Sequence, residues 1–318
     1  MDHPAIYGEA LAPANLAELE ADATRYINGV GKYWQITADN GAVSHLWGSY
    51  HSNERHVLAL PERVIAQIAA ARVVALETDF IYKSRRQIEL SFRQDDRYRG
   101  PGQSIDREIS DLPALLIANI RSRTHALGWG RDAADVLVPA AVIELIMSNP
   151  CDDFAAGVLP IQDDRIQMLG HINGAQILGL EPPNALFSKL SRPESKVLRQ
   201  AMLMIYATYL NPQTSSKNKS TSIQLYLEGR TGVSRAWDRA WLVAQLGDAA
   251  HNLLDRVDAY LLDARNAVFV TKVKPDLQVG GVFMAVGAFH LSGKQGMVEM
   301  LRRDGFAVTR TPIPGELP

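Results

Sequence analysis

The fold is encoded most clearly in two stretches, Val43-Ser-His-Leu-Trp-Gly-Ser-Tyr-His51 and Arg72-Val-Val-Ala-Leu-Glu77. The first predicts a strand over residues 43–49 that leads into a Gly-x-x-His sequence. The second is a short apolar run that ends in an acid, which is typical of a buried central strand. Between them, Pro61 favours the start of a helix whose apolar positions share one face. A strand, a helix and a strand in this order favour a crossover connection in a parallel or mixed sheet.

The flanking segments extend this pattern towards both ends of the chain. Residues 32–38 predict a strand that forms a hairpin with residues 43–49. Residues 176–181 form another apolar run ending in an acid, and residues 281–287 and 306–311 predict two further strands. The other periodic segments predict helices, one of them split at Pro139: residues 16–26, 111–147, 163–173, 193–210, 233–246, 250–263 and 292–303. The predicted fold class is therefore α/β, a mixed central sheet built from N- and C-terminal segments, flanked by helices, with a helical middle region.

The length of 318 residues allows one large domain or two small ones. The two ends of the predicted sheet carry an internal echo. Val74-Ala-Leu-Glu77 resembles Leu178-Gly-Leu-Glu181, and Gly48-Ser-Tyr-His51 resembles Gly287-Ala-Phe-His290. We therefore predict one domain with two quasi-repeated half-units and a helical insert, with these bounds: residues 1–318 for the domain, about 32–80 and 176–311 for the half-units, and about 108–173 for the insert.

The composition excludes several classes of protein. Hydrophobic residues make up 47% of the chain and charged residues 21%, the balance of a soluble globular protein rather than a disordered one. The net charge of −2 argues against a broadly basic surface that binds nucleic acid. The single cysteine, Cys151, excludes an intrachain disulfide framework and any multi-cysteine zinc or iron–sulfur site.

The sequence also bears on location and mobility. No apolar run approaches the roughly 18 residues that a membrane span needs. The first residues, Met1-Asp-His-Pro4, begin neither the positive nor the apolar part of a signal peptide, so we expect a cytoplasmic protein. A secreted protein from which a leader has been removed is the alternative. Residues 214–221 contain no apolar side chain and predict a mobile loop.

Two Gly-x-x-His sequences and two strand-end glutamates are the residues that suggest chemistry. A histidine just past a strand would project from the carboxyl edge of the sheet, where ligands bind in open α/β sheets. Imidazole is a common ligand for zinc, manganese, iron and cobalt, and carboxylates suit the harder ions. His51 and His290, with Glu77 or Glu181, could hold a divalent ion that activates water. A spare glutamate could then act as general base.

Each of these residues also has a plain structural interpretation. Gly-x-x-His is a short pattern, so His51 alone could be solvated or structural, and Glu77 and Glu181 could cap helices or pair with an arginine. His45 is in phase with Trp47 and lies well back from the strand end, so we interpret it as structural. The chain lacks a Gly-x-Ser-x-Gly sequence, which disfavours a serine hydrolase.

Five segments together resemble the TraB/PrgY/GumN family: Leu46-Trp-Gly-Ser-Tyr-His51, Val74-Ala-Leu-Glu-Thr-Asp79, Ile177-Leu-Gly-Leu-Glu181, Arg265-Asn266 and Ala285-Val-Gly-Ala-Phe-His-Leu291. They occur in the family's order and spread over about residues 32–311. That family is related to the Tiki metalloproteases and, more distantly, to ChaN-like and erythromycin-esterase-like proteins. The resemblance implies a mixed α/β fold whose sheet is built from both ends of the chain.

The same resemblance implies roles for individual residues. His51 and His290 would be metal ligands, and Glu77 would be a ligand or the general base, with Glu181 as its counterpart in the second half. Arg265 matches the family's Arg-Asn pair and would hold an anion or pair with a glutamate. The implied cofactor is a divalent manganese, cobalt or zinc ion.

The resemblance leaves two functions open. The first is a metal-dependent hydrolase, peptidase-like, acting on a peptide or small-molecule substrate. The alternative is a non-catalytic ligand-, metal- or haem-binding protein on the same scaffold. Proteolysis is attributed to the Tiki branch, whereas other branches are named for their genetic context. The chain also departs from the family at Tyr50 and Phe289, where bulky residues replace the smaller ones often found before each histidine and could narrow the site.

Overall fold

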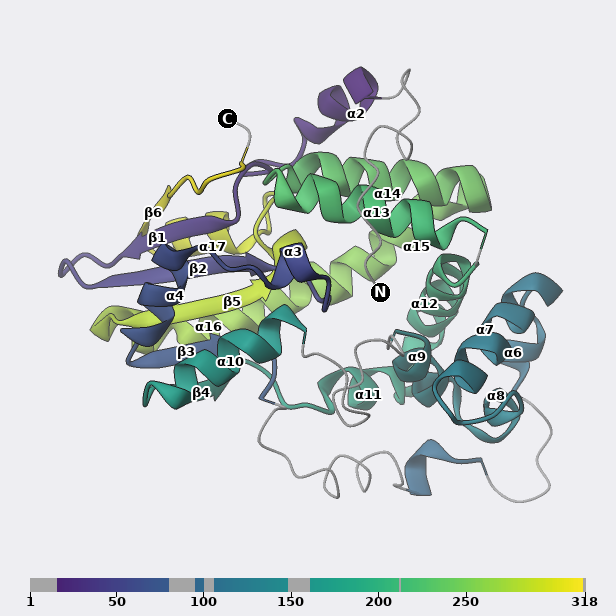
Figure 1. Cartoon of the computed structure of the whole chain (residues 1–318). Helices are drawn as coiled ribbons and strands as arrows, with labels where there is room; N and C mark the ends of the chain where they lie inside the picture. Colours follow the sequence, from purple (N-terminus) through teal and green to yellow (C-terminus); the bar gives the residue numbers. More distant parts are fainter. Residues whose placement is uncertain (1–15, 80–94, 100–105, 148–160, 212, 317–318) are drawn as a thin grey trace.

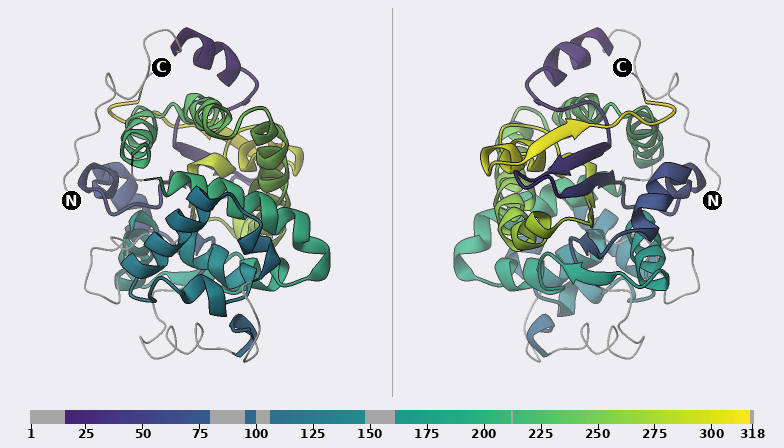
Figure 2. Two further views of the ribbon diagram at one scale, coloured as in Figure 1. Left: turned by 90° about the vertical axis from the view of Figure 1, so that its right-hand side faces the viewer. Right: turned by 90° about the vertical axis from the view of Figure 1, so that its left-hand side faces the viewer.

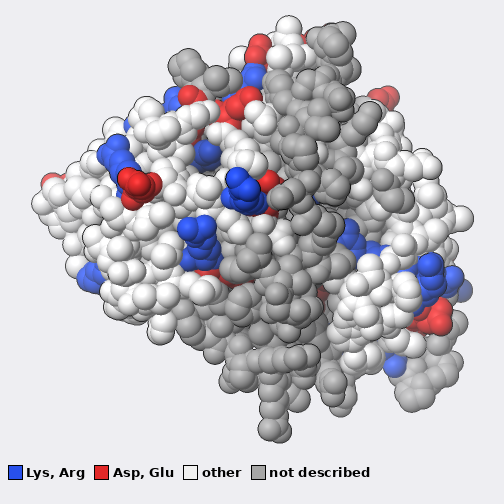
Figure 3. Space-filling model, in the orientation of Figure 1, with Lys and Arg blue, Asp and Glu red and all other residues white. Residues whose placement is uncertain are grey.

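A computed structural model describes most of the chain, as five ranges: residues 16–79, 95–99, 106–147, 161–211 and 213–316. Cys151 and the ends of the chain lie outside these ranges. None of the helices within them is long and apolar enough to cross a membrane. On the described part of the face in Figure 3, basic and acidic side chains are interspersed in small groups. That distribution agrees with the nearly balanced net charge.

A six-stranded mixed sheet forms one half of the molecule, with strand order β4-β3-β5-β2-β1-β6 (Figure 1). The strands span Tyr33–Thr37 (β1), Val43–Ser49 (β2), Val73–Leu76 (β3), Gln176–Gly179 (β4), Val282–Gly287 (β5) and Ala307–Arg310 (β6). The first four strands in this order run parallel to their neighbours, and β1 and β6 are antiparallel additions. The α/β fold with a sheet built from both ends of the chain is thus confirmed. The paired half-units stay a prediction.

Helices cover both faces of the sheet. On one face, α4 (Glu62–Ala69) and α10 (Gln162–Ile172) pack through side chains such as Ile68 and Ile166 against the inward residues of β2, β3 and β5. The short helix α3 (Arg55–Leu58) lies against α10. On the other face, α16 (Arg265–Val279) and α17 (Met297–Arg303) pack through apolar residues. Burying both faces explains why β3 and β5 are apolar at every position.

The other half of the molecule is helical and has its own apolar core (Figures 1 and 2). Its helices are α2 (Leu16–Ala23), α6 (Arg107–Ser110), α7 (Ala114–Ala126), α8 (Ala133–Val136), α9 (Pro139–Met147), α11 (Ala185–Leu190), α12 (Lys196–Tyr209), α13 (Ser215–Leu227), α14 (Thr231–Leu246) and α15 (Ala249–Asp258). The split expected at Pro139 is confirmed, since α8 ends at Val136 and α9 begins at the proline. The carboxyl ends of the parallel strands face this helical half, and the strand-end residues lie there.

Two sequence-based predictions about local structure are wrong. Residues 214–221 were expected to form a loop, but Ser215–Leu227 is the helix α13. Its polar Asn218 and Thr221 are buried, and Asn218 accepts a hydrogen bond from the Trp237 indole at 3.2 Å. The last helix, α17, begins at Met297 rather than at Ser292, because the chain first forms a short 3₁₀ turn at Ala288–His290.

Candidate functional site

The carboxyl ends of the four parallel strands bring the strand-end residues to one edge of the sheet. Ser49 pairs with Gly287 at the ends of β2 and β5, and Leu76 pairs with Gly179 at the ends of β3 and β4. The residues that follow these ends within a few positions are His51, Glu77, Glu181 and His290. All four sequence-predicted residues therefore come from neighbouring strands and reach the same edge.

Glu77 lies at the centre of this group. Its Oε1 atom is 3.6 Å from His51 Nε2 and 3.6 Å from His290 Nε2, so both imidazole rings face one carboxylate oxygen. The same oxygen accepts a hydrogen bond from the Gly287 backbone N–H at 2.8 Å. A Cβ atom at Gly287 would lie 3.2 Å from His51 Nε2 and 3.3 Å from Glu77 Oε1. Glycine at this position therefore keeps the space between the three side chains open.

Arg265 joins the two glutamates. Its Nη2 atom lies 2.6 Å from Glu77 Oε2 and 2.5 Å from Glu181 Oε1, and its Nε atom donates to the same Glu181 oxygen at 2.9 Å. Its Nη1 atom donates to Leu261 O and lies 3.4 Å from His290 Nε2. Arg265 follows a π-helical turn at Ala259–Ala264 that interrupts the continuous stretch from α15 to α16. Such turns are frequent at functional sites, and here the turn precedes the side chain that enters the site.

Each histidine is held from behind by an oxygen atom. His51 Nδ1 donates to Asp163 Oδ2 at 2.9 Å, and Asp163 Oδ1 accepts from the Ser49 hydroxyl at 2.7 Å. His290 Nδ1 donates to Asn266 Oδ1 at 2.6 Å. The Asn266 amide nitrogen donates to two backbone carbonyls, which fixes its oxygen towards the imidazole. A ring that carries its proton on Nδ1 presents an unshared pair at Nε2 when it is neutral.

The electrostatics of the two histidines differ. The Asp163 carboxylate raises the pKa of His51 well above the ordinary value of 6.5. Burial lowers the pKa of His290 to about 4, against the attraction of Glu77. Burial opposes the charged form of Glu77, but the facing histidines and Arg265 outweigh it and hold the Glu77 pKa well below 4.5. At neutral pH the site thus contains an ionised Glu77 and a neutral His290.

The donor set matches a divalent metal ion in kind. Two imidazole nitrogens and one carboxylate oxygen are common ligands, and the oxygen behind each ring is the usual second layer of such a site. Ligand bonds near 2 Å place two ligand atoms roughly 3–3.4 Å apart, somewhat closer than the 3.6 Å seen here. Among the residues that the structure describes, no group of three or more His, Cys, Asp or Glu side chains is arranged to hold a metal ion as it stands. Binding would therefore require a small movement of these side chains and of Arg265.

Sequence reasoning missed Asp163 and Gln162 and gave no role to Asn266. Asp163 lies in the first turn of α10, where an acid is expected for the helix dipole alone. Asn266 is part of the Arg-Asn pair, but nothing in the sequence indicates its bond to His290. Gln162 accepts hydrogen bonds from the Trp47 indole and the Tyr50 N–H, and so fixes the loop before His51.

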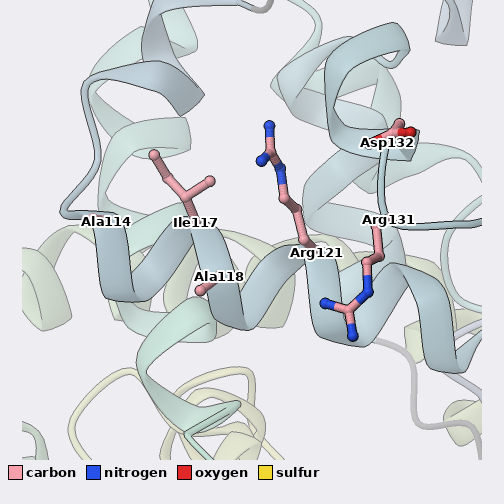
Figure 4. Close-up of a pocket in the computed structure, with 6 residues that line it drawn as sticks. All are labelled: Ala114, Ile117, Ala118, Arg121, Arg131 and Asp132. Carbon is pink, nitrogen blue, oxygen red and sulfur yellow. The ribbon is translucent and has the colours of Figure 1, made fainter.

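Two further observations concern residues outside this group. His45 Nδ1 lies 3.0 Å from the Tyr33 hydroxyl, and the imidazole ring of His45 stacks on the ring of Tyr33. These contacts agree with the structural interpretation of His45. A hollow on the helical half is lined by Arg121, Arg131 and Asp132 and by three apolar side chains of α7, Ala114, Ile117 and Ala118 (Figure 4). The two guanidinium groups point in different directions, and Arg121 pairs with Asp135 at 3.2 Å. This hollow lacks the converging polar groups of a ligand site.

Comparison with known proteins gives one result that covers most of the chain. The sequence profile of the TraB/PrgY/gumN family matches residues 33–310. No curated protein and no solved structure matches the chain. The profile spans all six strands and the five residues that sequence analysis predicted for the site, His51, Glu77, Glu181, Arg265 and His290. The site therefore lies within the region that the family shares. The chain therefore belongs to the TraB/PrgY/gumN family.

Proposed function

We propose that this protein is a metal-dependent hydrolase with peptidase-like activity, and that His51, His290 and Glu77 hold its divalent ion. The observation that carries the proposal is that both Nε2 atoms face one oxygen of Glu77, while both Nδ1 atoms are occupied. Neutral His290 directs an unshared electron pair at Nε2 towards this carboxylate, and His51 would do the same once a bound cation displaces the proton that Asp163 favours. Manganese, cobalt and zinc all accept such a donor set.

The residues of the chain have distinct roles in this proposal. A divalent ion bound there would supply Lewis acidity towards a carbonyl or a water molecule. Glu181 holds Arg265 through two nitrogen atoms and so orients its guanidinium. Arg265 would face the negative charge that develops when a carbonyl carbon is attacked. Glu77, the glutamate nearer both histidines, is the metal ligand, and Glu181 is the positioning residue for Arg265.

A specific observation also supports the alternative of a non-catalytic binding protein. Arg265 already pairs with both carboxylates, with contacts of 2.6 and 2.5 Å. A site whose carboxylates keep this partner could hold an anionic or haem-like ligand without any turnover. The two functions differ in what Arg265 does: in the hydrolase it releases Glu77 to the ion, and in the binder it stays.

Metal content and cleavage decide between these functions. Protein purified without chelator is analysed for bound metal and then incubated with a peptide library, with and without added manganese, cobalt or zinc. The hydrolase predicts bound metal at about one ion per chain and metal-dependent cleavage. His51→Ala and His290→Ala should abolish both, whereas His125→Ala, an exposed position on α7, should change neither. Cleavage that persists in the two site variants would refute the assignment.

A further inference from the structure

The strand β4 is an edge of the sheet within the described part of the chain, with β3 as its neighbour. The Gln176 N–H donates to Arg72 O, and the Leu180 N–H donates to Leu76 O. Alternate residues of a strand direct their backbone groups to opposite sides, so Ile177 and Gly179 direct theirs away from β3. Within the part of the chain that the structure describes, these two residues offer two N–H and two C=O groups to an incoming chain.

The opposite edge of the sheet is treated differently. Arg302 donates through Nε and Nη2 to the Val308 carbonyl of β6, at 3.1 and 2.7 Å, and β6 itself carries the charged Arg310. β4 reads Gln-Ile-Leu-Gly and contains neither a charge nor a proline. Charges, prolines and capping groups are the usual means by which edge strands avoid pairing. Apart from its short length of four residues, β4 has none of these protections within its own sequence, and its edge can pair with another strand.

The β4 edge is continuous with the candidate site. Glu181, which holds Arg265, follows Gly179 by two residues, or about 7 Å of extended chain. The other end of β4 follows α10, where Met168 and Ile172 lie one turn apart with 36% and 73% of their surfaces exposed. Figure 1 shows α10 alongside β4. A chain lying along β4 would therefore have exposed apolar side chains near one end and the site at the other.

We propose that the substrate of this site is an extended peptide that pairs with β4 as an added strand, an inference that rests on the proposed hydrolase function. Pairing through backbone groups binds many sequences, because every residue except proline carries the same N–H and C=O groups. The register would carry the scissile bond past Gly179 towards Glu77 and Arg265. The substrate class is then an unfolded or extended segment without proline at the paired positions, rather than a helix or a folded domain.

Backbone methylation of the peptide tests this mode of binding. The probe is a fluorescein-labelled, end-blocked peptide of ten alternating valine and serine residues, and its binding to the full chain is followed by fluorescence anisotropy with chelator present. Three further peptides carry N-methyl groups on the three central valines, on the three central serines, or on all six of these residues. A shift by one residue exchanges the two sets, so a peptide with one set methylated can still pair through the other, whereas the fully methylated peptide should bind at least about tenfold more weakly than the parent. Equal binding of the parent and the fully methylated peptide would overturn the proposal.

A pair of variants at Ile177 provides the matched control on the protein. Ile177→Pro removes the outward N–H and places a ring at the edge, whereas Ile177→Val keeps the N–H and the apolar character. We expect peptide binding to be lost in Ile177→Pro and retained in Ile177→Val, with thermal unfolding recorded for both. If Ile177→Pro does not fold, the fully methylated peptide still decides the question on the wild-type chain.

The outcomes separate this proposal from the proposed function. Loss of binding on full N-methylation without cleavage in any metal supports the β4 edge and refutes the hydrolase. Metal-dependent cleavage together with equal binding of the parent and the fully methylated peptide supports the hydrolase and refutes the edge. Sedimentation analysis covers a third case: if Ile177→Pro converts a dimer to a monomer while the wild type binds no peptide, the edge joins two copies of the chain and the proposal is wrong.

Discussion

The loops after β2 and β5 carry the same Gly-x-x-His motif in opposite environments. His51 has 53% of its side chain exposed and is bound by the Asp163 carboxylate, whereas His290 has 5% exposed and is bound by the Asn266 amide. Asp163 raises the pKa of His51, and burial lowers the pKa of His290 to about 4. The charged Asp163 partner favours the protonated form of the exposed His51 ring. Burial beside the neutral Asn266 favours the neutral form of His290, which keeps an unshared electron pair. One short motif therefore supplies two imidazoles with different chemistry.

The buried histidine should give the largest effect, on the free energy of unfolding at acid pH. Its folded-state pKa is about 4 and the unfolded value is 6.5. Below pH 6.5 the unfolded chain takes up a proton that the folded chain refuses, so stability falls as the pH drops from 6.5 to 4. A shift of this size corresponds to about 3 kcal/mol. Urea unfolding of the metal-free protein at pH 4–7 measures it.

The comparison variant for this prediction is His290→Gln, which removes the titrating group. The difference in unfolding free energy between wild type and variant should shrink towards pH 4, because only the wild type has this proton uptake in its unfolded state. Curves for the two proteins that stay parallel between pH 6.5 and 4 would show that His290 is not held neutral by the fold.

The sheet could be predicted from the sequence, whereas the helix α13 could not. Strands such as Val73–Leu76 are buried on both faces, so each is visible in the sequence as a run of apolar residues. The first turns of α13 contain no apolar run, because Asn218 is buried through a hydrogen bond to Trp237 rather than through an apolar side chain. Tertiary packing stabilises that helix, and local pattern cannot show it.

The residues of the candidate site also fall into two groups, those that could be predicted from the sequence and those that could not. His51, Glu77, Glu181 and His290 could be selected because each follows a recognisable strand. Asp163 could not be selected, because its contact with His51 joins residues 112 positions apart on different elements. The contact arises from the packing of α10 on the sheet, which the sequence predicts only as an apolar helical face. Residues at strand ends are thus predictable, and the residues that hold them depend on how separate elements pack.

The two motif glycines should give an intermediate effect and differ in kind. A Cβ atom at Gly48 would lie 2.6 Å from Leu291 Cδ1 and 3.1 Å from Ala288 Cα, inside the packed contact of the two loops. Gly48→Ala should therefore lower the free energy of unfolding by about 1–3 kcal/mol, the usual cost of overpacking. Gly287→Ala places its methyl group between His51 and Glu77. These side chains can move apart, so the loss of stability in Gly287→Ala should be smaller.

Chemical denaturation and metal titration on both glycine variants check this difference. Gly287→Ala should weaken metal binding more than tenfold while it unfolds near the wild-type urea concentration. Gly48→Ala should show the reverse order, with the larger loss in stability and the smaller loss in affinity. If the two variants lose stability and affinity in equal proportion, the two loops do not have the separate roles that their contacts indicate.

The smallest effect on stability should come from the partner of the exposed histidine. Because the Asp163 carboxylate raises the pKa of His51, Asp163→Asn should bring that pKa down towards 6.5. The stabilisation from protonated His51 is fully present below pH 6.5 and is lost as the pH rises through its folded value. His51 is half exposed, so solvent screening keeps this contribution below about 1 kcal/mol.

NMR titration of the imidazole signals of wild type and variant measures the shift in the His51 pKa directly, with chelator present. Asn266→Asp is the converse experiment, since a carboxylate there should raise the pKa of His290 despite its burial. If Asp163→Asn leaves the His51 pKa unchanged, the carboxylate does not cause the difference between the two loops, and exposure alone must explain it.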